Sequence, residues 1–243
     1  MKTLTLWTFI LILFTSCSTE SETADTSENQ SNLEDEVALY RADINPANSS
    51  NTYDAAGQLY YDISDSYHAQ GKTSVTTSGT IEQVETIANL NEGFQILRPA
   101  TYMSPTVARI DYILSNQQAT ALGIISNSSL STKAKLSLIE FITNLMVYRN
   151  QQVDYEVIYP FIIAYETAII ADNGYTANDK KIILTTSSIA RYEFYFAKKH
   201  RRKPRDRDWE ISWGHIIAGT DGSEHSTANA IVMASVCNLI DNK

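Results

Sequence analysis

The chain has 243 residues and a formal net charge of −9, and 43% of its residues are hydrophobic. This length allows one domain or two small ones. The acidic balance argues against nucleic acid as a partner for the chain as a whole. Its two cysteines, Cys17 and Cys237, are too few for a secreted domain held together by disulfides.

The first residues have the zones of a bacterial export signal. Lys2 is followed by an apolar run from Leu4 to Phe14, which is shorter than the roughly 20 residues needed to span a bilayer. The next residues, Phe14-Thr15-Ser16-Cys17, resemble the lipobox of bacterial lipoproteins, with Phe14 where Leu is usual. The resemblance implies that a signal peptide, residues 1–16, is removed and that Cys17 is lipidated, and several acyl chains on one residue anchor stably. An ordinary cleaved signal peptide with a chance cysteine is the alternative.

Residues 17–50 are expected to form a disordered acidic tether behind the lipidated cysteine. Residues 18–40 contain seven Asp or Glu and no Lys or Arg. Such a segment buries too little apolar surface to offset the entropy of ordering it. The acidic residues that follow Cys17 resemble the surface-export signals of some Gram-negative lipoproteins, and a plain solvated linker is the alternative.

From residue 51 to residue 243, the sequence predicts one all-α, bundle-like domain of about seven or eight helices. Nine glycines and five prolines are few for this length, which favours long helices over a turn-rich β architecture. Ser104-Pro105 is a helix start signal, Thr176 and Asp179 have capping-box spacing, and Pro160 predicts a kink or a break. The expected helices cover about 52–69, 81–88, 105–114, 131–150, 153–172, 177–199, 206–218 and 226–240.

Two short stretches, Asn51–Leu59 and Thr185–Tyr192, resemble segments of an uncharacterised family of small helical proteins from Gram-negative bacteria. The resemblance implies no known activity and transfers no catalytic residue. Both stretches also fit a helix start and a helix interior that packs in the core.

A basic segment, residues 198–207, stands out in this acidic chain. It predicts a site for an acidic protein, anionic headgroups or other phosphate-bearing envelope components. A solvated helix end is the alternative, since cations also suit the C-terminal end of a helix. Trp209 and Trp213 follow, and they either pack inside the domain or lie at a membrane or partner surface. The candidate binding residues are Lys198, Lys199, Arg201, Arg202, Lys203, Arg205 and Arg207.

The remaining polar residues give no strong metal signal. Asp65 and His68 share a helix face but have no second unit of the same kind, as a di-iron bundle would need. His215 and His225 flank a polar stretch that is expected to be an inter-helix loop; Asp221 and Glu224 in that loop, together with His225, could converge on a cation. A capping loop without metal is the preferred interpretation, because the ligand spacings typical of metal sites are absent.

Catalytic motifs are likewise missing from the sequence. There is no phosphate-binding loop, no His-Glu-x-x-His and no nucleophile elbow, so no catalytic residue, metal or cofactor is assigned. Cys237 lies among apolar residues and is expected to be a buried, inert thiol. Glu166 is a candidate general acid if buried, or it pairs with a cation such as Arg109, Arg149 or Arg191. The other carboxylates in apolar helices are Glu140, Asp154 and Glu156.

These observations favour a lipid-anchored helical module of the cell envelope that binds a protein or an anionic envelope component. Its membrane contact would be the lipid on Cys17, with the outer membrane favoured and the side it faces left open. Two alternatives stand beside this hypothesis. One is an envelope enzyme with a buried carboxylate or histidine site, and the other is an immunity-type lipoprotein that neutralises a toxin.

Overall fold

The computed structural model describes residues 44–71, 74–200 and 213–241. Ten helices and no strand are found in these ranges, which confirms the predicted all-α class. Residues 1–43, which include the predicted signal peptide, Cys17 and most of the predicted tether, lie outside the described residues. The helices are α2 (Asp54–Ala69), α3 (Thr77–Leu90), α4 (Glu92–Leu97), α5 (Val107–Ser115), α6 (Gln117–Asn127), α7 (Thr132–Asn150), α8 (Tyr155–Ala171), α9 (Ala177–His200), α10 (Gly214–His225) and α11 (Thr227–Asp241).

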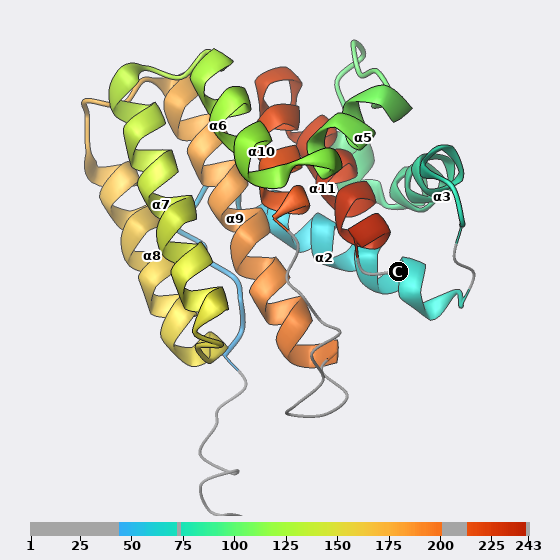
Figure 1. Ribbon diagram of the computed structural model, residues 1–243, viewed down its shortest axis with the longest axis horizontal. Coiled ribbons are helices and arrows are strands. Elements are labelled where there is room, and N and C mark those ends of the chain that lie inside the picture. The colour runs from blue at the N-terminus through green and yellow to red at the C-terminus, as the bar shows by residue number, and fades with distance from the viewer. Residues whose placement is uncertain (1–43, 72–73, 201–212, 242–243) are drawn as a thin grey trace, which may run out of the picture. The chain divides into compact units, whose positions relative to one another are not determined.

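Helix α9 lies at the centre of the domain, packed against α2, α8 and α10 (Figure 1). Between Lys181 and Lys198 its only charged residues are Arg191 and Glu193, and nearly every side chain in that stretch is buried. This stretch has no charged face, and a helix without a charged face is expected to be buried on all sides. The sequence of α9 therefore explains its central position, and it places two charged side chains inside the core.

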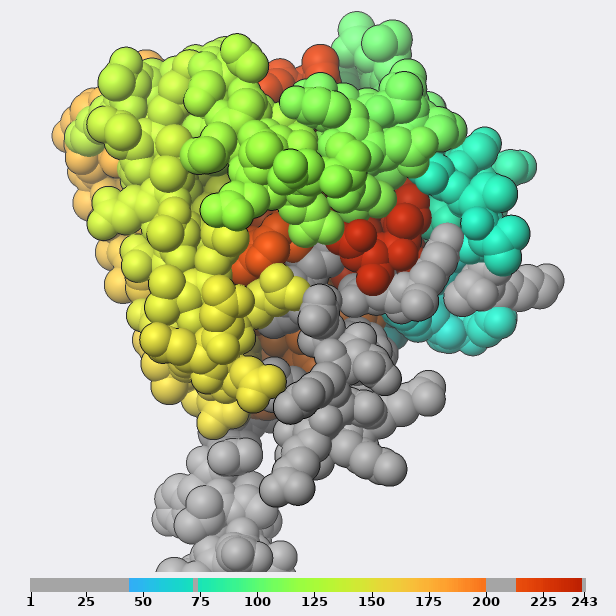
Figure 2. Space-filling view, viewed as in Figure 1, coloured from blue at the N-terminus to red at the C-terminus, as the bar shows by residue number. Residues whose placement is uncertain are grey.

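Helices α10 and α11 form an antiparallel pair beside α9, and α5 and α6 lie over them on the face seen in Figure 2. Gly222 permits the close approach of α10 to α11, because a Cβ there would lie 2.5 Å from the Ala230 nitrogen. The prediction of a polar loop between His215 and His225 is wrong. Gly219 to Glu224 are the last turns of α10, and most of them are buried against α11.

Local capping explains several helix starts. The Thr176 hydroxyl accepts a hydrogen bond from the Asp179 amide at 3.0 Å, and the Asp179 carboxylate accepts one from the Thr176 amide at 2.9 Å. This confirms the predicted capping box. The start signal at Ser104-Pro105 is displaced, since Thr106 caps α5 instead.

Three differences from the predicted helices have local causes. The short helix α4 was not predicted, and it begins where the Asn91 side chain accepts hydrogen bonds from two amides. Helix α6 was also not predicted; Asn116 ends α5 and caps α6. Pro160 does not split α8. It lies in the second turn of the helix, and the backbone hydrogen bond that it cannot donate would have gone only to the Glu156 carbonyl in the first turn. The domain therefore has more and shorter helices than expected.

Packing begins before the predicted boundary at residue 51. Pro46 is buried, and the side-chain amide of Asn48 donates a hydrogen bond from Nδ2 to Glu166 Oε2 at 2.6 Å. Residues 45–50 thus belong to the folded unit rather than to the tether. None of the helices in the described ranges is both long and apolar enough to cross a membrane.

Candidate functional site

Arg191 is the centre of a buried charged cluster between α2, α8 and α9. Its Nη2 donates to Asp54 Oδ1 and lies 3.4 Å from Glu166 Oε1. Both Arg191 and Glu166 have fully buried side chains, whereas Asp54 reaches the edge of the core. The structure thus selects Arg191 from the three possible partners of Glu166. We call this group the Arg191 cluster; its members are Asn48, Asn51, Asp54, Glu166, Ser187 and Arg191.

The Glu166 carboxylate is saturated with hydrogen bonds from three other side chains. Oε1 accepts from Asn51 at 3.0 Å and from Ser187 at 2.9 Å, and Oε2 accepts from Asn48. These donors keep the carboxylate well solvated by protein groups in place of water. Glu166 is therefore buried, as the general-acid alternative required. Its carboxylate oxygens, however, already accept hydrogen bonds from side chains of the fold.

The charge state of Arg191 is secured by its neighbours. Burial by itself lowers the pKa of Arg191. The negative charge of Glu166, the hydrogen bond to Asp54 and the negative charge of Asp54 together outweigh burial, so the pKa lies above its ordinary value. The guanidinium therefore stays positive, balanced by two carboxylates. These contacts are made through Nη2, whereas Nε and Nη1 of Arg191 are buried without a hydrogen-bond partner. The cluster links α2, α8 and α9 in the interior and presents no reactive group to solvent.

A second buried group joins α2, α9 and α10 and consists of Tyr60, Glu193 and His215. The Tyr60 hydroxyl donates to Glu193 Oε2, and the Tyr60 and His215 rings stack with centroids 6.1 Å apart. Burial raises the pKa of Glu193 to about 7, although the hydrogen bond from Tyr60 acts to lower it. Burial, and next the Arg149 charge, lowers the pKa of His215 to about 3. Around neutral pH the histidine is thus neutral, and Glu193 is close to its titration midpoint.

The His215 ring is unusual for a buried histidine. Neither Nδ1 nor Nε2 has a hydrogen-bond partner, and the side chain is fully buried. A buried polar atom without a partner costs about 1–3 kcal/mol. Among the described residues, the His215 ring stacks on the Tyr60 ring.

The predicted acidic group near His225 does not converge. The Asp221 carboxylate receives two hydrogen bonds from the Arg109 guanidinium, one of them at 2.7 Å from Nε, and Glu224 accepts from the Ser129 amide. Within residues 44–71, 74–200 and 213–241, no three His, Cys, Asp or Glu side chains are arranged to hold a metal ion. The polar residues of α10 therefore tie α10 to α5 and to the segment before α7.

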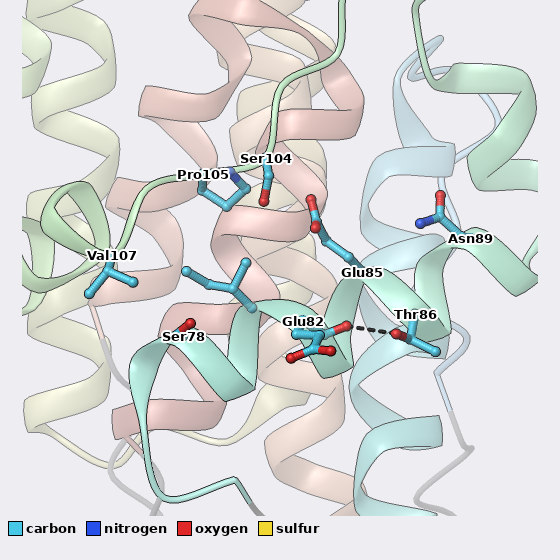
Figure 3. A pocket seen from close by; sticks show the side chains of 9 residues that line it. Ser78, Glu82, Glu85, Thr86, Asn89, Ser104, Pro105 and Val107 are labelled. Atoms are coloured by element: carbon cyan, nitrogen blue, oxygen red, sulfur yellow. Dashed lines mark hydrogen bonds between the residues drawn. The ribbon is translucent and has the colours of Figure 1, made fainter.

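A surface depression of about 410 Å³ lies between α3 and the segment that leads into α5 (Figure 3). Glu85 points toward Ser104 across it and also accepts a hydrogen bond from Tyr102 at 2.7 Å. The lining contains no residue of the two buried groups described above. Its members are Ser78, Ile81, Glu82, Glu85, Thr86, Asn89, Ser104, Pro105 and Val107.

Two residues of the basic segment, Lys198 and Lys199, lie in the last turn of α9. Lys198 Nζ is 2.9 Å from Glu156 Oε1 and 5.5 Å from the centre of the Tyr155 ring. Lys199 Nζ is 5.4 Å from the centre of the Tyr195 ring, and its side chain is exposed. The other predicted binding residues, Arg201, Arg202, Lys203, Arg205 and Arg207, lie outside the described residues, as does Trp209. Trp213 is buried, in agreement with the interior alternative.

Some important residues were not found from the sequence. Glu193 and its partner Tyr60 are 133 positions apart, so no local spacing joins them. A usable signal was present, however, because Arg191 and Glu193 interrupt a long uncharged stretch of α9. Cys237 was predicted to be buried and inert, and it is fully buried with a pKa raised by burial.

Comparison of the chain with protein-family models, with characterised proteins and with solved structures finds no match.

Proposed function

We propose that this protein is a cell-envelope binding module, held at a membrane by lipid on Cys17, which captures an anionic partner through its basic segment. The partner is a protein or another envelope component that carries negative charge. The supporting observation is that α9 ends with Lys198 and Lys199 over tyrosine rings, directly before five further Lys or Arg residues within 201–207. Clustered cations attract anionic surfaces at about 1 kcal/mol each near a membrane.

Glu166, the candidate general acid of the enzyme alternative, is committed to contacts inside the fold. An enzyme would need Glu166, Glu193 or His215 to face a cavity that admits substrate. The carboxylate of Glu166 is occupied by Arg191, Asn48, Asn51 and Ser187, and the depression beside α3 is lined by other residues. The proposal therefore assigns recognition to the surface and stability to the interior.

The proposed anchor has a direct test. Cells that express the full chain and are fed an alkyne fatty acid should incorporate the label, and Cys17→Ala should abolish incorporation, since the thiol is the acceptor of the diacylglycerol. Protease added to intact cells then reports which side of the membrane the domain faces. Wild-type protein without label would contradict the anchor, and Cys237→Ala is the control because that thiol is buried.

Capture of the partner tests the basic segment. The triple variant Arg201→Glu, Arg202→Glu, Arg205→Glu should reduce what the detergent-solubilised full chain retains from envelope extracts by about tenfold or more, because each reversal replaces attraction with repulsion. A matched variant, Lys133→Glu, Lys135→Glu, Lys181→Glu, changes the charge equally near the starts of α7 and α9. Equal retention by wild type and the first variant would refute the role of the basic segment.

A further inference from the structure

We infer that the depression between α3 and the segment before α5 binds an extended stretch of a partner protein in which a Lys or Arg lies between apolar side chains. We call this depression, whose lining residues are given above, the α3 groove (Figure 3). Every residue that forms it lies in the described part of the chain, so neither the basic segment nor the proposed anchor contributes to it.

The α3 groove follows one face of α3. Ser78, Glu82 and Asn89, with Glu85 and Thr86 between them, recur at helical spacing and therefore share that face. Ser78 lies at one end of the groove and Asn89 at the other (Figure 3). The helix rises about 16 Å between these two residues, which is the length of about five residues of extended chain. The groove is therefore long enough for a short peptide segment.

Part of the lining is apolar. Ile81 of α3 is buried beneath it, and Pro105 and Val107 belong to the opposite wall, where Val107 is 40% exposed. Two further apolar side chains come next to lining residues in the sequence. Leu90, the last residue of α3, is 80% exposed, and Met103, which precedes the opposite wall, is 76% exposed. Apolar side chains of a partner would find contacts along this wall and at both of its ends.

Exposed apolar side chains are concentrated in the elements that surround the groove. Of the ten large apolar side chains that are exposed in the described ranges, six belong to residues 75–112, and the other four are spread over α6, α7 and α8. Single exposed apolar residues are ordinary, whereas a concentration of them marks a contact with a partner. The six are Val75, Leu90, Ile96, Met103, Val107 and Tyr112.

The charge of the groove favours a cation. Its lining has two carboxylates, Glu82 and Glu85, and no Lys or Arg. Glu82 is exposed, and Glu85 accepts a hydrogen bond from Tyr102 at 2.7 Å. Arg98 is held at the far end, where it donates to Asn89 at 2.8 Å and lies over the Tyr102 ring. A lysine or arginine of the partner would therefore meet complementary charge in the middle of the groove.

The combination of apolar and acidic lining favours a polypeptide over a small cation. A small cation would use the carboxylates alone and leave the apolar wall in water. In an extended chain, neighbouring side chains point to opposite sides, so a cation can face Glu82 while the next side chain contacts Val107. The hydroxyls of Ser78 and Ser104, one on each wall, can donate and accept hydrogen bonds, as a peptide backbone requires.

Fluorescence anisotropy of labelled peptides tests the groove, with the detergent-solubilised full chain as the receptor and micelles alone as the blank. The probe Val-Lys-Val-Lys-Val should bind, and Val-Glu-Val-Glu-Val should not. Ser-Lys-Ser-Lys-Ser should bind about fivefold more weakly than the probe, because it lacks the apolar contacts. Equal binding of the two lysine peptides would overturn the inference and indicate a site for a bare cation. Failure of the probe to bind would overturn it outright.

Substitutions place the bound peptide in the groove. Thr86→Phe fills the groove and keeps both carboxylates, so it should weaken binding of the probe about tenfold or more. Thr143→Phe is the matched control, because both threonines are exposed in a helix and donate to the carbonyl four residues earlier. Glu82→Gln should weaken binding about threefold, and Glu140→Gln, an exposed carboxylate of α7, should not. A Thr86→Phe protein that binds the probe as tightly as wild type would overturn the inference.

Discussion

Replacing Arg191 with methionine should lower the free energy of unfolding at neutral pH by about 3–5 kcal/mol. The substitution leaves the Glu166 carboxylate buried without its counter-charge, and Asp54 loses its hydrogen bond from Nη2. Removing one member of a buried ion pair costs far more than removing the pair, because the remaining charge is desolvated and uncompensated. For a domain of this size the loss amounts to a large part of the total stability.

Urea unfolding followed by circular dichroism at neutral pH measures this effect. The double variant Arg191→Met with Glu166→Gln should be more stable than Arg191→Met alone, since the second substitution removes the uncompensated charge. Lys133→Met is the control: its pair with Asp172 is exposed, so the unfolding midpoint should stay close to that of wild type. An Arg191→Met protein as stable as wild type would show that the Arg191 cluster does not hold α2, α8 and α9 together.

Glu193→Gln and His215→Phe should change the pH dependence of stability in opposite directions. The folded-state pKa of Glu193, about 7, exceeds its ordinary 4.5, so the unfolded chain releases this proton first as pH rises. The contribution of Glu193 to the free energy of unfolding is complete below about pH 4.5 and is lost as pH rises through about 7. The free energy of unfolding falls by about 3 kcal/mol over this range. Glu193→Gln should abolish that loss.

His215 acts with the opposite sign. Its folded-state pKa, about 3, lies below the ordinary 6.5, so the unfolded chain takes up the proton first as pH falls. Its contribution is complete above about pH 6.5 and is lost as pH falls through about 3, a change of about 5 kcal/mol. His215→Phe keeps a ring against Tyr60 and should abolish the acid-side loss.

Free energies of unfolding measured in urea between pH 3 and pH 8 separate the two effects. The Glu193→Gln protein should gain stability up to about pH 6.5 and then stay constant, whereas the His215→Phe protein should lose stability between about pH 4.5 and about pH 7. His225→Phe, an exposed site on the same helix, controls for the loss of an imidazole. Identical pH profiles in wild type and both variants would refute the assigned pKa values.

Local features of the chain were predictable because they depend on neighbouring residues. The all-α class follows from helical spacing, and the Thr176–Asp179 capping box needs only three residues of separation. Cys237 could be predicted as buried because its neighbours are apolar. The same reasoning gave too few helices, since short helices such as α4 depend on single caps, as at Asn91.

The interior polar groups depended on tertiary structure. Asn51 and Glu166 are 115 positions apart, and Arg109 and Asp221 are 112 apart, so helical spacing could not join them. Polar residues from Gly219 to Glu224 suggested a loop, but packing of α10 between α9 and α11 made them a buried helix. The sequence by itself determined the helical class, the Thr176–Asp179 capping box and where the basic segment lies along the chain. Only the tertiary structure decided which buried charges meet, because opposite charges in a core are selected by contact across helices rather than by spacing along the chain.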